Sequence, residues 1–324
     1  MPNIDPKVIF WLSVAIAIAG VPGLTYVPKK LITNINLPGY EAASDFIRER
    51  LSISPELALS HNIQRLRGIA LAGGPGTGKT MFGMSVAKTA NRMLLIWSLG
   101  ETQGGIVGQT EANARRAINI IQATEAAVLV DDLDKSGASQ ATSGHTGDGG
   151  VFSRLINMLL TEMSSPDNRA LWIFTMNRLA NVPPELLRDG RVDRRFAVMS
   201  PDEITRANIL RVHCDKRKMD TSNAKDAQGI LDVARICEDF VGAELEALVN
   251  HGAIRALAAN TDKLDWEWMT DQASGITPLR KQEVYADDIR KMEEATKDFV
   301  KVGRIQGKGT TKTGPARSGR SIGI

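Results

Sequence analysis

Short apolar runs alternate with longer segments of helical spacing through the first two-thirds of the chain. Apolar runs of this length, bounded by Gly, Asp or Asn, are typical of buried strands, and the segments between them repeat as helices do. The predicted strands are residues 68–72, 93–97, 126–130, 170–175 and a last short one within 190–199. The predicted helices are residues 41–51, 55–66, 81–91, 110–123 and 151–163. This alternation predicts an α/β fold with a parallel sheet and a site at the carboxyl ends of the strands.

From residue 201 onward the chain has helical spacing without strands. The predicted helices are residues 202–216, 230–238, 243–259 and 285–302. We therefore expect an α/β domain over residues 31–200 and a small α-helical lid domain over residues 201–302. Residues 303–324 are rich in Gly, Thr, Ser, Lys and Arg and contain no acidic residue, which predicts a disordered basic tail.

The N-terminal segment, residues 1–30, contains a long stretch without charge, from Val8 to Val27. Its dense part, residues 8–21, is short for a membrane span, and the extension to Val27 includes Pro22 and Gly23. Three interpretations stay open. The stretch is a membrane anchor, a buried helix docked on the α/β domain or on a neighbouring subunit, or a cleaved signal peptide.

Composition excludes little but narrows the class of partner. The 324 residues carry 40 basic and 37 acidic side chains, a net charge of +3, which is too balanced to argue for nucleic acid. The two cysteines, Cys214 and Cys237, have no metal-binding or redox spacing, which favours a reducing compartment.

The segment between the first strand and its helix, residues 73–80, fits G-x-x-x-x-G-K-[ST] at every position. Its glycines let successive N–H groups point at phosphate oxygens, and the helix that follows adds partial positive charge. The lysine of the motif can reach the β- and γ-phosphates, and its last hydroxyl can bind Mg²⁺. The predicted nucleotide ligands are Gly74, Pro75, Gly76, Thr77, Gly78, Lys79 and Thr80.

Polar residues at two other strand ends supply the remaining chemistry. Asp131 ends an apolar strand and can hold Mg²⁺ through water beside Thr80, while Asp132 can polarise the attacking water. Asn177 ends another strand and can orient the same water. Downstream, Arg191, Arg194 and Arg195 follow a glycine and can neutralise charge that develops on a γ-phosphate, in cis or from a neighbouring subunit.

These motifs together resemble those of AAA-type ATPases, a subgroup of the AAA+ P-loop proteins. The resemblance covers residues 37–302 and rests on G-G-P-G-T-G-K-T, V-L-V-D-D-L-D, T-M-N-R, P-E-L-L-R-D-G-R-V-D-R and F-V-G-A-E-L. G-G-I-V-G-Q-T-E with V-P-P-E-L-L-R is most similar to the small AAA proteins of cyanobacteria and plastids. The D-D-L-D stretch is also similar to Rubisco activase.

The resemblance implies a homo-oligomeric ring, usually a hexamer, with ATP and Mg²⁺ at the subunit interfaces. It implies that Arg191 and Arg194 act on the neighbour's ATP, and that His213 lies near the nucleotide. It also implies that Gly39, Gly242 and Ala243 flank the adenosine, and that Ile106, Val107 and Gly108 form a pore loop that grips a polypeptide.

Two departures from the family pattern bear on function. Asp132 stands where a longer Glu is usual, so its activation of water can be weaker or indirect. Ile106 stands where an aromatic residue is usual, which reduces contact area and grip. Local remodelling of one partner protein is therefore easier to support than processive threading.

The resulting hypothesis is an oligomeric ATPase, cytoplasmic or in the plastid stroma, that remodels a protein or protein complex. The first alternative is a nucleotide-switched scaffold, tethered to a membrane through residues 8–27, that hydrolyses ATP slowly. The second is a DNA-associated loader or motor, for which only the charge of the tail speaks. A fused zinc protease is not expected, because H-E-x-x-H is absent from the sequence.

Overall fold

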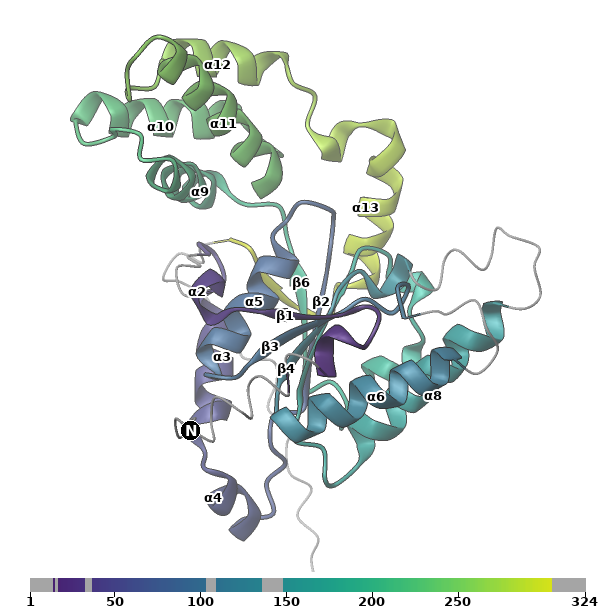
Figure 1. Ribbon diagram of the computed structural model, residues 1–324. Coiled ribbons are helices and arrows are strands. Elements are labelled where there is room, and N and C mark those ends of the chain that lie inside the picture. Colours follow the sequence, from purple (N-terminus) through teal and green to yellow (C-terminus); the bar gives the residue numbers. More distant parts are fainter. Residues whose placement is uncertain (1–13, 15–16, 33–36, 103–108, 136–147, 305–324) are drawn as a thin grey trace, which may run out of the picture.

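A seven-stranded sheet forms the centre of the protein, in the order β1-β3-β4-β5-β2-β6-β7 (Figure 1). The computed structural model describes residues 14, 17–32, 37–102, 109–135 and 148–304. The strands are β1 (Leu24–Val27), β2 (Gly68–Gly73), β3 (Leu94–Trp97), β4 (Ala127–Val130), β5 (Leu171–Met176), β6 (Arg194–Val198) and β7 (Val300–Val302). All neighbouring strands pair in parallel except β1, which is antiparallel to β3. The predicted α/β class with a parallel sheet is confirmed.

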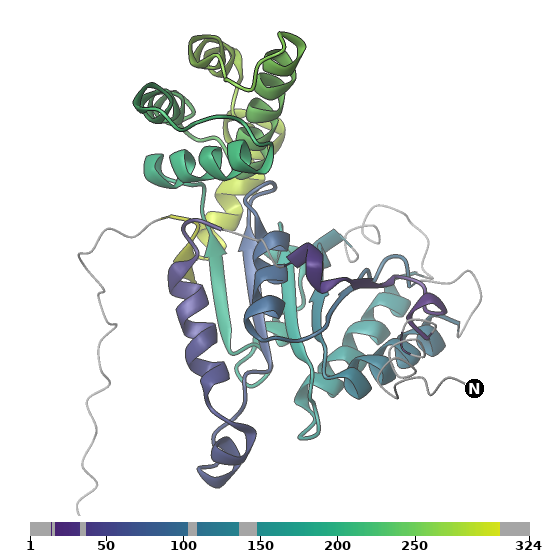
Figure 2. The ribbon, with the colours of Figure 1, turned by 60° about the vertical axis from the view of Figure 1, so that its left-hand side comes forward.

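Helices cover both faces of this sheet (Figure 2). One face packs against α3 (Glu41–Ser52) and α5 (Lys79–Thr89), and the other against α6 (Gln109–Thr124) and α8 (Asp148–Ser164). Short elements complete the body, namely α2 (Lys29–Ile32), α4 (Pro55–Ser60), η1 (Leu179–Asn181) and η2 (Pro184–Leu187). Because both faces are covered, the central strands β2, β4 and β5 are buried at every position and almost wholly apolar, as the sequence indicated.

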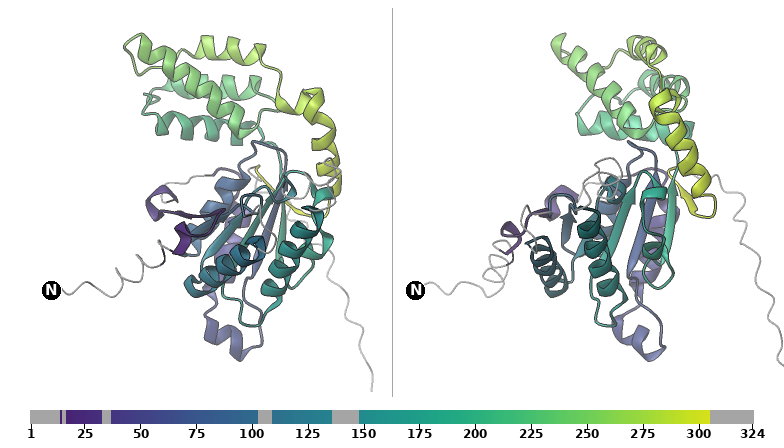
Figure 3. Two further views of the ribbon diagram at one scale, coloured as in Figure 1. Left: turned by 45° about the vertical axis from the view of Figure 1, so that its right-hand side comes forward. Right: turned by 90° about the vertical axis from the view of Figure 1, so that its right-hand side faces the viewer.

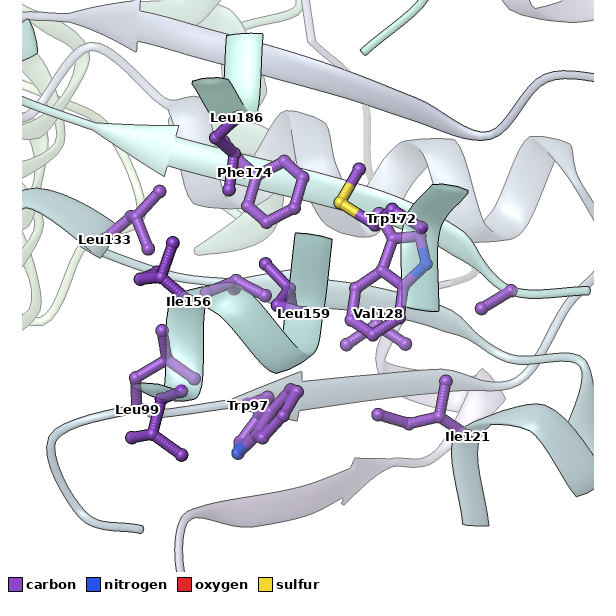
Figure 4. Packing of buried hydrophobic residues seen from close by; sticks show 14 of the residues in the cluster. Trp97, Leu99, Ile121, Val128, Leu133, Ile156, Leu159, Trp172, Phe174 and Leu186 are labelled. Carbon is purple, nitrogen blue, oxygen red and sulfur yellow. The ribbon is translucent and has the colours of Figure 1, made fainter. Parts of the chain in front are cut away.

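Large aromatic side chains fill the core between the sheet and α8 (Figure 4). The Trp172 and Phe174 rings stack with their centroids 6.5 Å apart, and Trp97 lies 6.3 Å from Trp172. Ile156 and Leu159 of α8 pack into the same cluster. This packing fixes the ends of β4 and β5, from which the acidic and amide groups of the site project.

Four helices form the lid above the sheet (Figure 3). They are α9 (Glu203–Lys216), α10 (Ala224–Ile236), α11 (Gly242–Ala258) and α12 (Trp266–Gly275). Their apolar faces share a separate core that includes Leu210, Leu248 and Trp266. The lid therefore has a hydrophobic core of its own.

The last part of the chain differs from the expected lid. After η3 (Leu279–Lys281), α13 (Glu283–Ala295) descends from the lid to the sheet, and β7 pairs with β6. Met292 of α13 and Val302 of β7 lie in the two cores of the sheet. The prediction of one helix over residues 285–302 within the lid was therefore wrong, because the end of the chain returns to the sheet.

The N-terminal stretch also differs from the expected boundary at residue 30. Leu24–Val27 is β1, an edge strand of the sheet, and Ile18, Val21 and Leu24 are buried in the core that faces α6 and α8. Over the described residues, none of the helices combines the length and apolarity that crossing a membrane requires. The described part of this stretch is thus integrated in the α/β body, while residues 1–13 lie outside the described residues.

Candidate active site

The loop between β2 and α5 wraps around the ammonium group of Lys79. Lys79 Nζ donates to the carbonyl oxygens of Gly73 and Gly74 at 2.9 and 2.7 Å. Gly76 and Gly78 have φ values of +73° and +95°, a region that favours glycine, and a Cβ on Gly76 would lie 2.8 Å from a Val241 methyl group. The chain therefore turns tightly into α5, and the free N–H groups at the start of this helix form a phosphate site.

Burial lowers the pKa of this lysine. Lys79 is 6% exposed, and desolvation lowers its pKa to about 8, against the opposing effect of Asp132, Asp134 and Asp131. A bound triphosphate brings further negative charge, which favours the protonated form.

Asp131 and Thr80 meet at the end of β4. The Thr80 hydroxyl donates to Asp131 Oδ1 at 2.9 Å, and the Thr175 hydroxyl donates to the same oxygen at 2.5 Å. Hydroxyl and carboxylate oxygens are the hard ligands that Mg²⁺ prefers, and here they lie within one hydrogen bond of each other. The residues present fit a magnesium ion, which Thr80 and Asp131 would hold.

Asp132 adopts a left-handed conformation, with φ of +49°, and its N–H donates to Thr175 Oγ1 at 2.9 Å. Asn177 Nδ2 donates to Asp132 Oδ1 at 2.7 Å, so the two residues expected to handle the attacking water are in direct contact. Lys135 Nζ lies 2.5 Å from the other oxygen, Oδ2. This hydrogen bond is the main reason why the pKa of Lys135 is raised.

Sequence reasoning gave Asp134 and Thr175 no role at this site. Asp134 is 2% exposed, and its two oxygens accept from the backbone N–H groups of Asn177 at 2.9 Å and Arg178 at 3.2 Å. Thr175 connects Asp131 to the backbone of Asp132. A polar side chain inside or beside an apolar strand could have marked both residues as functional candidates. Their hydrogen-bond partners, however, lie more than forty positions away in sequence, so local spacing does not predict these contacts.

A cavity of about 930 Å³ lies between this loop and the lid. Its lining combines apolar and polar side chains from both parts of the molecule. From the body these are Leu31, Leu37, Pro38, Tyr40, Pro75, Gly76, Thr77, Gly78, Lys79, Thr80, Met81, Asp132, Lys135 and Asn177. From the lid they are Ile209, Val212, His213, Asp215, Lys216, Gly242, Ala243 and Glu246. A pocket of this size, with apolar walls and phosphate-binding groups at one end, suits a nucleoside triphosphate.

All but two of the predicted nucleotide ligands line this cavity. Gly39 lies in sequence between two lining residues, Pro38 and Tyr40, and a Cβ on Gly74 would face Ile289. The predicted magnesium ligand Asp131 is not part of the lining but accepts a hydrogen bond from Thr80, which is. Tyr40 fixes the apolar end, since its hydroxyl donates to the Thr77 carbonyl at 3.0 Å and its ring stacks 4.6 Å from Phe82.

His213 lies in the lid wall of the cavity and is buried. Desolvation lowers its pKa; the carboxylate of Glu246, with Oε1 3.6 Å from Nδ1, opposes this, and the charges of Arg217 and Lys216 add to it. A neutral imidazole offers both a donor and an acceptor to a bound nucleotide.

Arg191 and Arg194 are not among the described residues that line the cavity. Arg191 Nη1 donates to the Glu185 carbonyl at 2.7 Å, and the Arg194 guanidinium sits 4.8 Å above the Phe46 ring. Arg194 pairs with Ile69 at the start of β2, whereas the phosphate loop follows the end of β2. Ile106, Val107 and Gly108 fall outside the described residues.

The parallel sheet, the phosphate loop and the paired strand-end carboxylates define a P-loop nucleoside triphosphatase domain. Residues 69–200 match the model of the "ATPase family associated with various cellular activities (AAA)". Over these residues the chain is therefore similar to AAA ATPases, and its site contains the residues with which that family binds ATP and Mg²⁺.

Curated relatives agree with this assignment. Protein SAV of Sulfolobus acidocaldarius is 35% identical over 207 residues, covering 63% of this chain and 25% of that protein. The AAA domain-containing protein ycf46 of Pyropia yezoensis is 27% identical over 217 residues, covering 67% of this chain and 43% of that protein. The ATP-dependent zinc metalloprotease FtsH of Streptobacillus moniliformis is 33% identical over 205 residues, covering 62% of this chain and 29% of that protein. The chain therefore spans less than half the length of each of these relatives.

Proposed function

We propose that this protein is a homo-oligomeric ring ATPase, a hexamer, that uses ATP hydrolysis to remodel a protein or protein complex. One observation carries the proposal: the phosphate loop and the lid helices α9 and α11 line the same cavity. A nucleotide held there contacts both bodies, so loss of its γ-phosphate changes what holds the lid against the sheet.

Each side chain then has a defined role. Lys79 neutralises the β- and γ-phosphates, and Thr80 with Asp131 holds Mg²⁺. Asp132 accepts a proton from the water that Asn177 orients. Arg191 and Arg194 face the ATP of the neighbouring subunit, which is consistent with their distance from the cavity of their own subunit.

The test is capture of the partner by a variant that binds ATP without turning it over. Asp132→Asn, with ATP and Mg²⁺, should retain the remodelled protein, to be identified by mass spectrometry. Lys79→Ala is the matched control, because it should lose ATP binding and capture nothing. Equal recovery from both variants would contradict ATP-dependent remodelling.

A nucleotide-switched scaffold with slow hydrolysis is the second candidate. It is favoured by the short Asp132 side chain, whose two oxygens already contact Asn177 and Lys135. The two functions differ in the effect of the captured partner, which should accelerate steady-state hydrolysis by a remodeller and leave that of a scaffold unchanged.

The setting we propose is the cytoplasm or the plastid stroma. Both cysteines are free and buried, as suits a reducing compartment. The balanced charge makes nucleic acid an unfavoured partner.

A further inference from the structure

The carboxylate of Asp132 is engaged at both oxygens. Oδ1 accepts from the Asn177 amide at 2.7 Å, and Oδ2 contacts the Lys135 ammonium at 2.5 Å. The N–H of Asp132 is held by Thr175, which fixes the backbone from which the carboxylate projects. A water that gives its proton to Asp132 must therefore approach beside one of these two partners.

The two partners differ in mobility. Asn177 is partly buried, and its own N–H is anchored on the buried Asp134. Lys135 has a side chain that is 68% exposed, and its ammonium group contacts Asp132 from the end of a long flexible chain of methylenes. Of the two contacts, the ion pair with Lys135 is the one that can open without disturbing the strands.

We propose that Lys135 is a positioning residue that restrains Asp132 and slows ATP hydrolysis until their ion pair opens. This inference rests on the proposed ATPase function. In the step concerned, the water oxygen bonds to the γ-phosphorus, the bond from phosphorus to the β–γ bridging oxygen breaks, and the water proton passes to Asp132. ADP leaves with the bridging oxygen, and the proton returns to phosphate or solvent.

Proton transfer neutralises Asp132 and so removes the attraction that holds Lys135. The reaction therefore has to overcome the ion pair as well as the chemical barrier. An exposed pair of this kind is worth a factor of up to about five in a rate. Lys135 also lines the cavity with Lys79 and Thr80, so the negative charge of a γ-phosphate can compete for the same ammonium.

The decisive variant is Lys135→Met, which keeps the length of the side chain and removes its charge. We expect kcat to rise about two- to five-fold while KM for ATP changes less than kcat, and Lys135→Arg to behave as the wild type. Salt screens exposed pairs, so the ratio between variant and wild type should shrink as ionic strength rises.

Two controls separate this effect from others. Lys297 forms an ion pair with Glu294 at the same i,i+3 spacing, and its side chain is also 68% exposed, but it lies away from the cavity lining. Lys297→Met should leave kcat unchanged. In an Asp132→Asn background, which should bind ATP without turning it over, Lys135→Met should restore no hydrolysis, because Lys135 acts only through Asp132.

The outcomes are distinct. Wild-type protein that does not hydrolyse ATP would contradict the proposed function. If Lys79→Ala abolishes hydrolysis but Lys135→Met hydrolyses ATP no faster than the wild type, the restraint is overturned and the proposed ATPase function stands. Hydrolysis that Lys135→Met restores to the Asp132→Asn variant, or a rise in kcat that Lys297→Met reproduces, would also overturn the restraint.

Discussion

At the residue scale, the three aspartates that follow strand β4 each bind a different kind of hydrogen-bond donor. Asp131 accepts from two hydroxyl groups, Asp132 from an amide and an ammonium group, and Asp134 from two backbone N–H groups. Asp134 thereby fixes the position of Asn177, a lining residue, without itself lining the cavity. Asn177, which is expected to orient the attacking water, therefore depends for its position on a carboxylate that takes no part in the reaction itself.

Asp134→Asn should therefore lower both stability and turnover. The amide can keep one acceptor but presents a donor to the other N–H group, which leaves a buried group unpaired at a cost of about 1–3 kcal/mol. Urea unfolding measures the first effect and steady-state ATPase the second. Asp189→Asn, at a carboxylate that is 92% exposed, is the control and should change neither.

The two lid thiols should be unreactive in the folded protein. Burial raises the pKa of Cys214 and of Cys237 to about 12, so neither forms thiolate at pH 8. Because unfolded thiols ionise near pH 8.5, the folded state binds more protons between that pH and about 12, and stability falls as pH rises through this range. Alkylation at pH 8 should be complete in urea and negligible without it; rapid labelling of native protein would contradict this burial.

Arg191 and Arg194 should act on the neighbouring subunit. Each Ala variant should bind ATP yet lose about 10³-fold or more in turnover, and mixing with Asp132→Asn should restore some activity. Arg195→Ala is the control, since Arg195 pairs with Asp189 on the surface. Unchanged turnover in Arg191→Ala and Arg194→Ala would remove them from the mechanism.

Some residues of the site can be predicted from the sequence and others cannot, because only some of them lie in contiguous motifs. The phosphate loop is contiguous, so its spacing alone predicts its conformation, and Asp132 and Asn177 are recognisable at strand ends. Lys135, Tyr40 and Glu246 reach the cavity from three separate elements, and only the fold brings them together. Roles that depend on such long-range contacts cannot be read from local spacing.

At the element scale, the predicted central strands and major helices agree with the structure, whereas β1, β7 and α12 were not predicted. β1 pairs only at the sheet edge, and β7 is three residues long and pairs with a strand about one hundred positions earlier. The helix α12 buries Trp266, Met269 and Ala273. Their helical spacing is visible in the sequence, but the polar residues between them obscure it. Edge and short elements depend on tertiary pairing more than on local pattern.

The contact between α10 and α12 gives an element-scale prediction. A Cβ on Gly229 would lie 2.3 Å from the Trp266 ring, which cannot withdraw without losing its hydrogen bond to Asp226 at 2.8 Å. Gly229→Ala should therefore destabilise the lid by about 1–3 kcal/mol. Gly275→Ala, at the end of α12 with no atom within 4 Å, is the matched control and should be neutral or slightly stabilising. Equal free energies of unfolding would contradict the packing.

At the scale of the whole molecule, the N-terminal and C-terminal parts of the described chain close the two edges of the sheet. β1 covers β3 on one side and β7 covers β6 on the other. The separate core of the lid connects to this sheet through the segment before α9 and through α13. Arg178 and Asp288, 2.5 Å apart, further link the segment after β5 to α13.

Removal of residues 1–30 should therefore damage the ATPase body and not merely release it from an anchor. The deletion removes β1, which leaves the outer edge of β3 unpaired, and uncovers the core where Val21 and Leu24 are buried. Exposed apolar surface and a free strand edge both promote aggregation. Deletion of residues 1–13 alone is the control, because it keeps β1 and its core contacts. Gel filtration and urea unfolding should show an aggregated or less stable product only for the longer deletion. A monodisperse product with an unchanged unfolding midpoint would mean that β1 contributes nothing to the body.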